Sequence, residues 1–582
     1  MALDCVSSYL HALKENWQPV LLLVPYSVGA AALAYVWQKR KEVRTWIKVA
    51  QENRERAFRE MERAVEQFKK QNPGLTSESV LSLSFKDLHK NLQDGQLSPE
   101  HVLYTYIEKA LEVTNQVNCV VDYLQECEQQ LQEMKRNPRK GLLYGIPVSI
   151  KENIDYKGHY TSLGFARFLD KKASEDSVVV KVLKKQGAIP FVKTNLSQSM
   201  LSYDCSNPIY KQTKNPWNPK KTPGGSSGGE GALIGGEGSV LGFGTDLAGS
   251  IRMPSSFCGI CGLKPTEHRI SKHLVRTTTP GQKSLASMLG PMARDVDSLA
   301  LCMKAVLCQD MFDLDPNVPP LPFNDEVYNS KKKLRIGYYD RDGFWLPHPS
   351  MRRAVMETKK LLEAAGHTLV QFPLPDVEDA IYSMIRKGVF ADGCAVLREK
   401  FEWDVIDPNL TEMVALCRTP VLIRKVMAFF LKFWDKNTAR SIVMSCGIRS
   451  VKDLWSLHVK IENFQKEFVN QMRKLEIDVI LCPALGPALT IGYPQKASDA
   501  ISYTVLYNHL NFPAGVVPVS KVTEEDEKQL SLQTPQTRLE KIFYEGVKGG
   551  VGLPIAVQCV ALPWQEELCL RFMKEVETLT RK

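Results

Sequence analysis

An uncharged, largely apolar stretch lies close to the start of the chain. Residues 19–37 contain no charged side chain, and Lys39-Arg40-Lys41 follows almost at once. As a helix, this stretch spans roughly 28 Å, close to the hydrocarbon thickness of a bilayer. We interpret it as one transmembrane helix after an N-terminal segment of residues 1–18. The basic cluster then places the rest of the chain in the cytosol, by the positive-inside rule. A cleaved signal peptide and a buried core helix are the alternatives.

The next segment, residues 38–75, is highly charged but keeps a helical period. Its apolar side chains recur at roughly helical spacing, at Trp46, Val49, Phe58, Met61, Val65 and Phe68. Asn72-Pro73-Gly74 ends the pattern. We therefore predict a connecting helix that lies on the body of the protein.

The remainder, residues 76–582, shows no linker or internal repeat and is predicted to be one domain. Short β-rich runs alternate with helical patterns, the runs at 147–150, 188–192 and 477–482 and the helices at 178–186 and 351–365. Ser98 before Pro99 is a typical N-cap. Such alternation predicts an α/β fold, with a central mixed, mostly parallel twisted sheet covered by helices on both faces.

Composition limits the function classes only loosely. The 582 residues carry 75 Lys and Arg against 65 Asp and Glu, a net charge of +10 that suits anionic lipid as well as nucleic acid. The 14 cysteines are scattered, which favours a reducing compartment. Cys258 and Cys261 form a lone CxxC pair, and because no second pair or nearby histidines follow at zinc spacing, we expect two buried residues and no metal. We expect no nucleic-acid partner.

A second apolar segment, residues 418–440, differs from the first because basic residues are mixed into it. Six Lys or Arg and one Asp, a balance of +5, lie among Val421, Phe429, Phe430, Phe433 and Trp434. This combination is typical of an interfacial helix that dips into one leaflet of a membrane. An ordinary core helix is the alternative.

The candidate chemistry lies between Gly224 and Pro254. Gly224-Gly225-Ser226-Ser227-Gly228-Gly229 is followed by Thr245-Asp246-Leu247-Ala248-Gly249-Ser250-Ile251-Arg252-Met253-Pro254. Serines among so many glycines are candidates for nucleophilic chemistry. The short match Gly224-x-Ser226-x-Gly228 fits a nucleophile elbow with a histidine base, but no clear strand ends at Pro223. The glycines match neither common phosphate-binding loop.

The whole run resembles the amidase signature family, with more than a dozen fixed positions across Gly224–Ser255. The resemblance implies a Ser–Ser–Lys triad without cofactor or metal. Its members would be Ser250 as nucleophile, Ser226 as bridging serine after a cis peptide bond, and Lys151 as base. It also implies that the backbone N–H groups of Leu247, Ala248, Gly249 and Ser250 bind the oxyanion. Ser227, Asp246 and Arg252 are expected to hold the loops.

The role of Lys151 makes a physical demand on its surroundings. A lysine is a base only when neutral, so its pKa must fall from about 10.4 to near 7. The apolar run Leu142–Ile150 before it is a candidate source of the necessary burial. A surface lysine after an apolar strand is the alternative.

The flanking sequence narrows the resemblance to vertebrate, membrane-bound members of the family that hydrolyse fatty acyl amides. It covers the chain from about residue 50 to the end and implies acyl ethanolamide and primary fatty amide substrates, internal membranes, a homodimer, and Met200 at the acyl site. These members usually have glycine where this chain has Ala248. Because the extra methyl lies at the oxyanion turn, the rate of hydrolysis is not predicted. The segments 272–284 and 376–410 are more divergent, so chain-length preference is not carried over. A small-amide amidase and a catalytically weak membrane protein that binds a partner are the competing functions.

Overall fold

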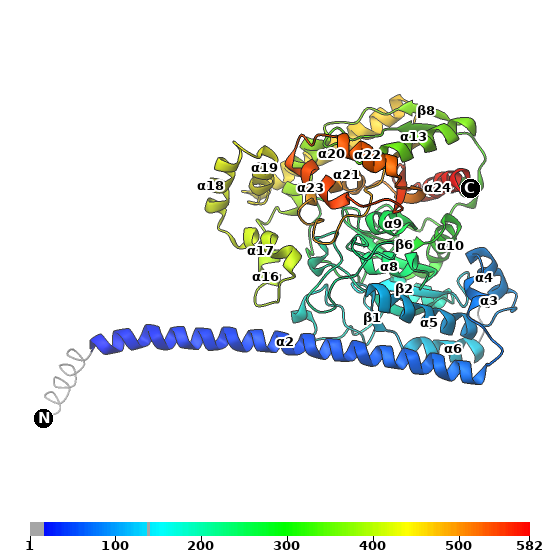
Figure 1. Cartoon of the computed structure of the whole chain (residues 1–582), viewed down its shortest axis with the longest axis horizontal. Coiled ribbons are helices and arrows are strands. Elements are labelled where there is room, and N and C mark those ends of the chain that lie inside the picture. The colour runs from blue at the N-terminus through cyan, green and yellow to red at the C-terminus, as the bar shows by residue number, and fades with distance from the viewer. Residues whose placement is uncertain (1–16, 137–139, 582) are drawn as a thin grey trace.

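A mixed sheet of eleven strands forms the centre of the described chain (Figure 1). The computed structural model describes residues 17–136 and 140–581; at the start of its first helix, the side chains of 17–30, 32 and 33 are not described. The strands lie in the order β1-β3-β2-β4-β6-β5-β10-β11-β9-β7-β8. Their bounds are β1 Val120–Tyr123, β2 Pro147–Lys151, β3 Ile189–Thr194, β4 Leu241–Asp246, β5 Cys261–Lys264, β6 Met288–Ala293, β7 Arg335–Tyr338, β8 Thr368–Gln371, β9 Val479–Pro483, β10 Ala514–Lys521 and β11 Pro554–Ala561.

Helices cover both faces of this sheet. Those before β7 are α2 (Trp17–Gln71), α3 (Glu78–Leu81), α4 (Phe85–Gln93), α5 (Pro99–Val117), α6 (Glu126–Arg136), η1 (Ala166–Phe168), α7 (Val178–Lys185), η2 (Gln198–Met200), α8 (Gly228–Gly235), α9 (Arg252–Cys258), α10 (Val296–Val306), α11 (Gln309–Leu314) and α12 (Asp325–Asn329). Those after it are α13 (Pro349–Ala364), α14 (Val377–Asp379), η3 (Ala380–Arg386), α15 (Lys387–Val389), α16 (Ala395–Lys400), η4 (Pro408–Leu410), α17 (Thr411–Arg418), α18 (Val421–Leu431), α19 (Lys436–Met444), α20 (Val451–Lys474), η5 (Ser498–Ile501), α21 (Ser502–His509), α22 (Glu524–Leu532), α23 (Arg538–Val547) and α24 (Glu566–Thr580). Helices α8 and α9 pack on one face and α7, α10 and α24 on the other.

The sheet is mixed, as predicted, but the prediction that it is mostly parallel is wrong. Within the described residues, four neighbouring strand pairs are parallel and six are antiparallel. The reason is that β6 inserts between β4 and β5, which α9 connects, and β11 inserts between β9 and β10, which α21 connects. Each inserted strand runs against both neighbours. Alternation along the chain predicts the crossovers but not the insertions.

The individual elements agree closely with the hydrophobic pattern. Strands β2, β3 and β9 and helices α7 and α13 coincide with the predicted runs within a few residues. All residues of β2, β3 and β9 are buried, which explains their continuous apolar runs. The hydroxyl of Ser98 accepts a hydrogen bond from the backbone N–H of His101 at 3.1 Å, so the predicted N-cap is confirmed.

The predicted span and connecting helix belong to one continuous helix, α2, which ends at Gln71 as expected. At 55 residues it is roughly 80 Å long. Its C-terminal half packs on the body through a buried stripe that includes Met61, Val65 and Phe68, and Arg54 donates to the carbonyl of Val120. Its N-terminal part continues beyond the body (Figure 1).

No helix among the residues available for the search combines the length and apolarity required of a membrane span. The proposed span, residues 19–37, lies mostly where side chains are not described.

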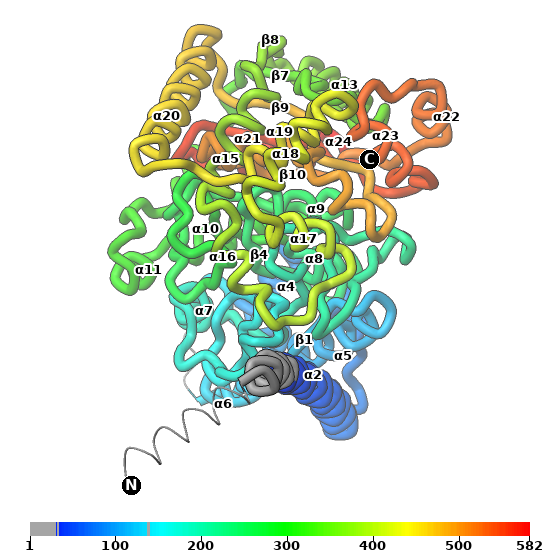
Figure 2. The backbone as a smooth tube through the Cα atoms, turned by 90° about the vertical axis from the view of Figure 1, so that its left-hand side faces the viewer, coloured from blue at the N-terminus to red at the C-terminus, as the bar shows by residue number. Residues whose placement is uncertain are grey.

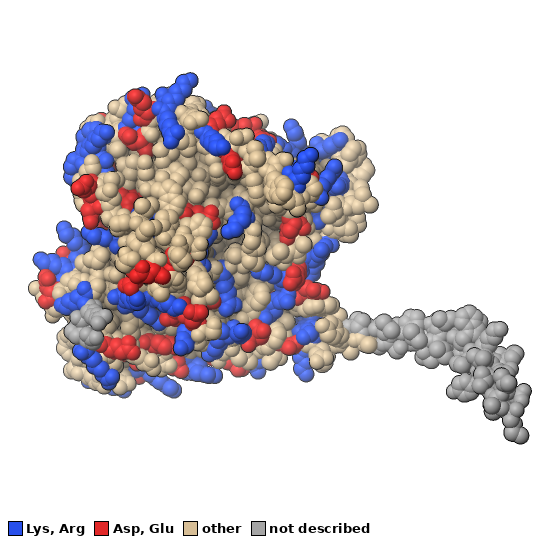
Figure 3. All heavy atoms as spheres, turned by 180° about the vertical axis from the view of Figure 1, so that it is seen from behind, with Lys and Arg blue, Asp and Glu red and all other residues tan. Residues whose placement is uncertain are grey.

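Helices α18 and α19 form a protruding lobe on the side of the body toward which α2 extends (Figures 1 and 2). In α18 only Arg424 and Ala428 are buried, so the alternative of an ordinary core helix is wrong. The exposed apolar side chains include Leu422, Phe429, Phe430, Phe433 and Trp434, the last 80% exposed. Seen from behind, the lobe presents many side chains that are neither basic nor acidic (Figure 3).

Two of the six basic residues in the segment 418–440 are not free at the surface. Arg424 is 1% exposed and donates inward to the carbonyls of Ser445 and Gly393. Arg440 pairs with Glu378. Arg424 is buried among protein acceptors and the charge of Arg440 is compensated by Glu378, so neither guanidinium adds a free positive charge to the surface.

Candidate active site

Lys151 is the last residue of β2 and is completely buried. Its Nζ donates to Ser226 Oγ at 2.7 Å and to Thr245 Oγ1 at 2.9 Å. Burial lowers the pKa of this amine to about 7, so a large fraction is neutral at neutral pH. The alternative of a surface lysine is wrong, and the amine can act as a base toward a neighbouring hydroxyl.

Ser226 lies in the loop before α8, and the peptide bond between Gly225 and Ser226 is cis, as the resemblance implies. Ser227 joins this loop to the second one. Its backbone N–H donates to the carbonyl of Ser250 at 3.2 Å, and its Oγ donates to the carbonyl of Thr245 at 3.2 Å. Ser227 therefore holds the two serine loops together, as expected.

Asp246 organises the turn that carries Ser250. Its carboxylate accepts from the N–H groups of Gly249 at 2.7 Å and Ile251 at 3.1 Å, from Arg252 Nε at 3.1 Å, and from Asn508 Nδ2 at 2.9 Å. Burial alone would raise its pKa, but the charge and hydrogen bonds of Arg252 hold the pKa of Asp246 well below its ordinary value. Asp246 and Arg252 thus hold the turn, as expected.

The turn can accept only glycine at position 249. The φ of Gly249 is +123°, and a Cβ there would lie 2.4 Å from Thr504 Oγ1. The same Thr504 hydroxyl donates to the carbonyl of Ala248 at 2.7 Å. Thr504 therefore holds the carbonyl of Ala248 and leaves no room for a side chain at position 249. Ala248 is half-buried and lines a cavity.

The structure brings most of the predicted substrate-binding residues to one cavity. Met200, Leu247, Ala248 and Ser250 line it, and Ser250 is 7% exposed. Gly249, Ser226 and Lys151 do not line the cavity, and the loop of Ser226 is joined to that of Ser250 through the N–H of Ser227. Within the described part of the chain, the hydroxyls of Ser226 and Ser250 make no hydrogen bond to each other. The two serine loops are therefore joined here through the backbone of Ser227 and not through a hydrogen bond between the two hydroxyls.

Two residues beside Lys151 were missed by the sequence analysis, Thr245 and Glu230. Glu230 is completely buried on α8 and accepts from Ser149 Oγ at 2.6 Å and Thr194 Oγ1 at 2.7 Å. Ser149 lies two residues before Lys151 on β2, and Thr194 is the neighbour of Lys151 on β3. Burial raises the pKa of Glu230 to about 8, so the carboxyl is mostly protonated at pH 7. The only sequence signal for Glu230 was its position, an acidic residue four residues after Ser226 in a stretch otherwise free of charge.

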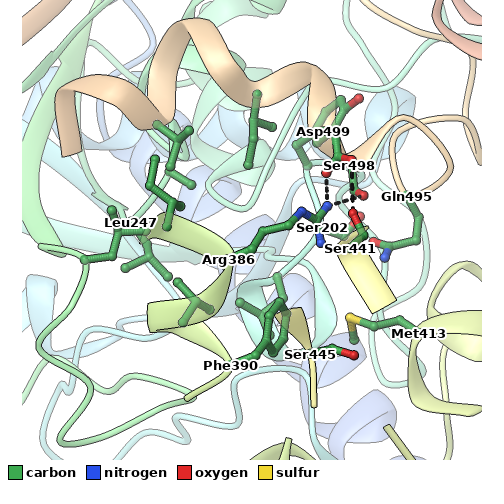
Figure 4. A pocket seen from close by; sticks show the side chains of 18 of the residues that line it. Ser202, Leu247, Arg386, Phe390, Met413, Ser441, Ser445, Gln495, Ser498 and Asp499 are labelled. Atoms are coloured by element: carbon green, nitrogen blue, oxygen red, sulfur yellow. Dashed lines mark hydrogen bonds and ion pairs between the residues drawn. The ribbon is translucent and has the colours of Figure 1, made fainter. Parts of the chain in front are cut away.

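The cavity is largely apolar and extends from the Ser250 turn toward α16 and α17. Apart from the turn, its walls come mainly from η3, α15, α17 and η5, with Ile381, Ile385, Val389, Phe390, Leu416 and Ile501 among the apolar side chains. Figure 4 shows Leu247 on one side and a group of polar side chains around Asp499 on the other. A concave, mainly apolar site with few polar groups is typical of a small-molecule pocket.

A second, more polar cavity shares Met200, Leu247 and Leu285 with the first. Its other lining residues include Lys272 and Arg276. The turn before Ser250 therefore lies between an apolar and a polar compartment.

Comparison with known proteins places these features in a family. The family model for Amidase matches residues 101–570. Fatty-acid amide hydrolase 1 of Sus scrofa is 50% identical over 552 residues, 94% of this chain and 95% of that protein. Vitamin D3 hydroxylase-associated protein of Gallus gallus is 53% identical over 434 residues, 74% and 94% of the two chains. A solved structure of a fatty acid amide hydrolase matches with a TM-score of 0.78 and 25% identity, over 93% of this chain and 96% of that one. The chain therefore belongs to the amidase family and is an amidohydrolase.

Proposed function

We propose that this protein is a membrane-bound serine amidase that hydrolyses fatty acyl amides, both acyl ethanolamides and primary fatty amides. The products are a free fatty acid and an amine. One observation carries the proposal: a buried lysine with a pKa near 7 contacts Ser226, whose loop is hydrogen-bonded to that of Ser250, a serine that lines a largely apolar cavity. The fatty-acid amide hydrolases of similar sequence support the substrate class.

The catalytic sequence follows from the roles proposed for three residues. Neutral Lys151 takes a proton from Ser226, which takes one from Ser250, and Ser250 Oγ attacks the amide carbonyl. The N–H groups of residues 247–250 stabilise the oxyanion. The ammonium of Lys151 then returns its proton through Ser226 to the leaving nitrogen, which leaves poorly unless it is protonated. Water attacks the acyl-enzyme by the same relay and releases the acid.

The two cavities suit the two halves of such a substrate. The apolar cavity would hold the acyl chain, because burying methylene groups there is favourable by about 0.8 kcal/mol each. The polar cavity, with Lys272 and Arg276, would hold the amine portion and admit water. Leu247, which lines both cavities, would lie beside the scissile amide.

A membrane attachment completes the proposal. Helix α2 extends past the body on the side where α18 exposes its apolar side chains (Figure 1). We propose that residues 19–37 span the bilayer and that α18 and α19 rest in the cytosolic leaflet, so that a lipid amide reaches the cavity without crossing water. The body would face the cytosol of an endoplasmic reticulum or other internal membrane. We also propose a homodimer, from the family resemblance. Sedimentation of the protein in detergent, which measures the mass of the assembly, tests this.

A fluorophosphonate probe tests the proposed nucleophile. It should label the wild-type protein, with the adduct mapped to Ser250 by mass spectrometry, and should not label the Ser250→Ala variant. Ser531→Ala, at an exposed serine of α22 that does not line the cavity, is the control and should still be labelled. Absence of labelling in the wild type, or an unchanged signal in Ser250→Ala, would contradict the proposal and favour a catalytically weak protein that binds a partner. Faster turnover of acetamide than of oleamide would instead favour a small-amide amidase.

A further inference from the structure

One wall of the apolar cavity carries a group of polar side chains that the proposed reaction does not use. We call Arg386, Ser441, Gln495, Ser498 and Asp499 the polar patch; all five line the cavity. They come from η3, α19, η5 and the loop before η5. In Figure 4 they lie together, with Arg386 pointing toward Ser498 and Asp499 and with Leu247 on the opposite side of the cavity.

The patch is held together by an ion pair. Arg386 Nη2 pairs with Asp499 Oδ1 and donates to Ser498 Oγ at 3.1 Å. The second carboxylate oxygen of Asp499 accepts from Tyr382 Oη at 3.1 Å and from Ser441 Oγ at 3.4 Å. Both oxygens of Asp499 therefore have donors, and the carboxylate is fixed in place.

Two polar groups of the patch remain without partners in the part of the chain that the structure describes. Arg386 Nε and Nη1 donate to no protein acceptor there, and Gln495 Oε1 is buried and accepts from no donor. The wall thus offers unused N–H donors and an unused acceptor to whatever occupies the cavity. Filling this space with methylene groups alone would leave the buried Gln495 Oε1 unsatisfied, at a cost of about 1–3 kcal/mol, and would offer no acceptor to the Arg386 N–H groups.

We infer that the cavity is adapted to acyl chains that carry a hydroxyl group, which the polar patch recognises. A hydroxyl oxygen accepts from Arg386, and its hydrogen donates to Gln495 Oε1, so one group satisfies both unused partners. This inference rests on the proposed function, in which the apolar cavity holds the acyl chain. The amine portion is not the group recognised, because the second cavity already offers it a polar site on the far side of the shared Leu247 turn.

Competition between hydroxylated and plain substrates tests the inference. The full-length protein in detergent is given octadecanamide and a set of octadecanamides with one hydroxyl at carbons 6 to 16. At least one isomer should exceed octadecanamide in kcat/KM by about tenfold, the value of one well-made hydrogen bond of 1.4 kcal/mol. In Arg386→Met the ratio should fall about tenfold, while the matched Lys387→Met, which changes a basic residue outside the cavity, should keep the wild-type ratio.

A second variant is needed in case Arg386→Met, which loses the ion pair with Asp499, does not fold. Gln495→Leu leaves the ion pair intact and should lower the same ratio. No isomer better than octadecanamide, or ratios that both variants leave unchanged, would overturn the inference.

A binding measurement separates this inference from the proposed function. If the wild type hydrolyses none of the amides, the proposed function fails, and the inference is decided on Ser250→Ala protein. There the same amides displace the fluorescent ligand 11-(dansylamino)undecanoic acid. Tighter binding of one hydroxylated isomer that Gln495→Leu removes would support the inference, and equal binding of all isomers would overturn it.

Discussion

The amine of Lys151 lies 2.7 Å from the hydroxyl of Ser226, at the point where the buried end of β2 meets the loop before α8. Because burial lowers the pKa of Lys151 to about 7, the base of the proposed reaction is neutral at physiological pH and charged in mild acid. The pH dependence of turnover follows from this single titration.

The wild-type rate should rise with pH through about 7 and fall about tenfold for each unit below it, since only neutral Lys151 accepts a proton. A steady-state profile of kcat/KM between pH 5 and 9 measures this. A rate that is flat from pH 5 to 8 would contradict the assignment of Lys151 as the base.

Replacing the base should remove the plateau of the rate above pH 7. Lys151→Ala is expected to lower kcat by roughly 10²–10⁴ at pH 7, the usual contribution of a positioned general base, and its residual rate should rise with hydroxide concentration. Lys193→Ala is a matched control, because Lys193 is equally buried on the neighbouring strand but donates to Tyr160 and Thr161 instead of a serine of the site. Lys193→Ala should keep the wild-type pH profile, and if Lys151→Ala keeps it too, Lys151 does not act as the base.

Glu230 gives a prediction about stability. Glu230→Ala removes the shortest hydrogen bonds of the Ser149 and Thr194 hydroxyls, which keep only longer ones to Ser239 Oγ and to the carbonyls of Leu241 and Ile150. Each hydrogen bond lost in this way costs about 0.5–1.5 kcal/mol. Glu230→Gln has the same shape and no charge, like the mostly protonated carboxyl at pH 7. Urea unfolding at pH 7 should therefore show a clear loss of unfolding free energy for the alanine variant and about 1 kcal/mol or less for glutamine. Equal losses would show that the hydrogen bonds of the carboxyl oxygens are not the cause.

The oxyanion turn gives a paired prediction at adjacent positions. Gly249→Ala places a Cβ 2.4 Å from Thr504 Oγ1 at a φ of +123°, so the turn must shift and kcat should fall by about 10²–10³, as when an oxyanion donor is lost. Ala248→Gly keeps the carbonyl that accepts from Thr504 and should stay within about threefold of wild type, since one methyl in a pocket changes little. Single-turnover hydrolysis measures both, and a Gly249→Ala enzyme of normal rate would refute the role of the turn.

The catalytic constellation was far easier to predict than the sheet that supports it. Both serines and Lys151 were named by the resemblance of Gly224–Ser255 to the amidase signature, whereas the short match around Ser226 alone pointed to a nucleophile elbow. The burial of Lys151 followed from the apolar run before it. Strand direction was missed because β6 and β11, the next strands along the chain after β5 and β10, fold back between the two strands that precede them. Glu230 was missed because its partners, Ser149 and Thr194, lie on two other strands.

The same limit applies to the surface of the lobe, where the sequence shows which residues are apolar but not which arginines turn inward. Arg424 is buried by contacts with Ser445 and Gly393, which lie on segments outside α18. Long-range contacts of this kind have no local pattern in the chain.

The lobe gives the last prediction, on membrane binding. Changing Phe429, Phe433 and Trp434 together to serine removes the most exposed aromatic surface of the lobe, of which Trp434 is 80% exposed, without touching buried Arg424 or Ala428. In a chain that lacks residues 1–40, we expect this triple change to lower binding to vesicles of phosphatidylcholine and phosphatidylserine by tenfold or more, because burial of apolar area is worth about 25 cal/mol per Å². Trp217→Ser, at an exposed aromatic far from the lobe in sequence, is the control and should bind normally. Flotation of the vesicles measures the bound fraction, and if the shortened chain with an intact lobe stays entirely in solution at low salt, the lobe is not a membrane-binding surface.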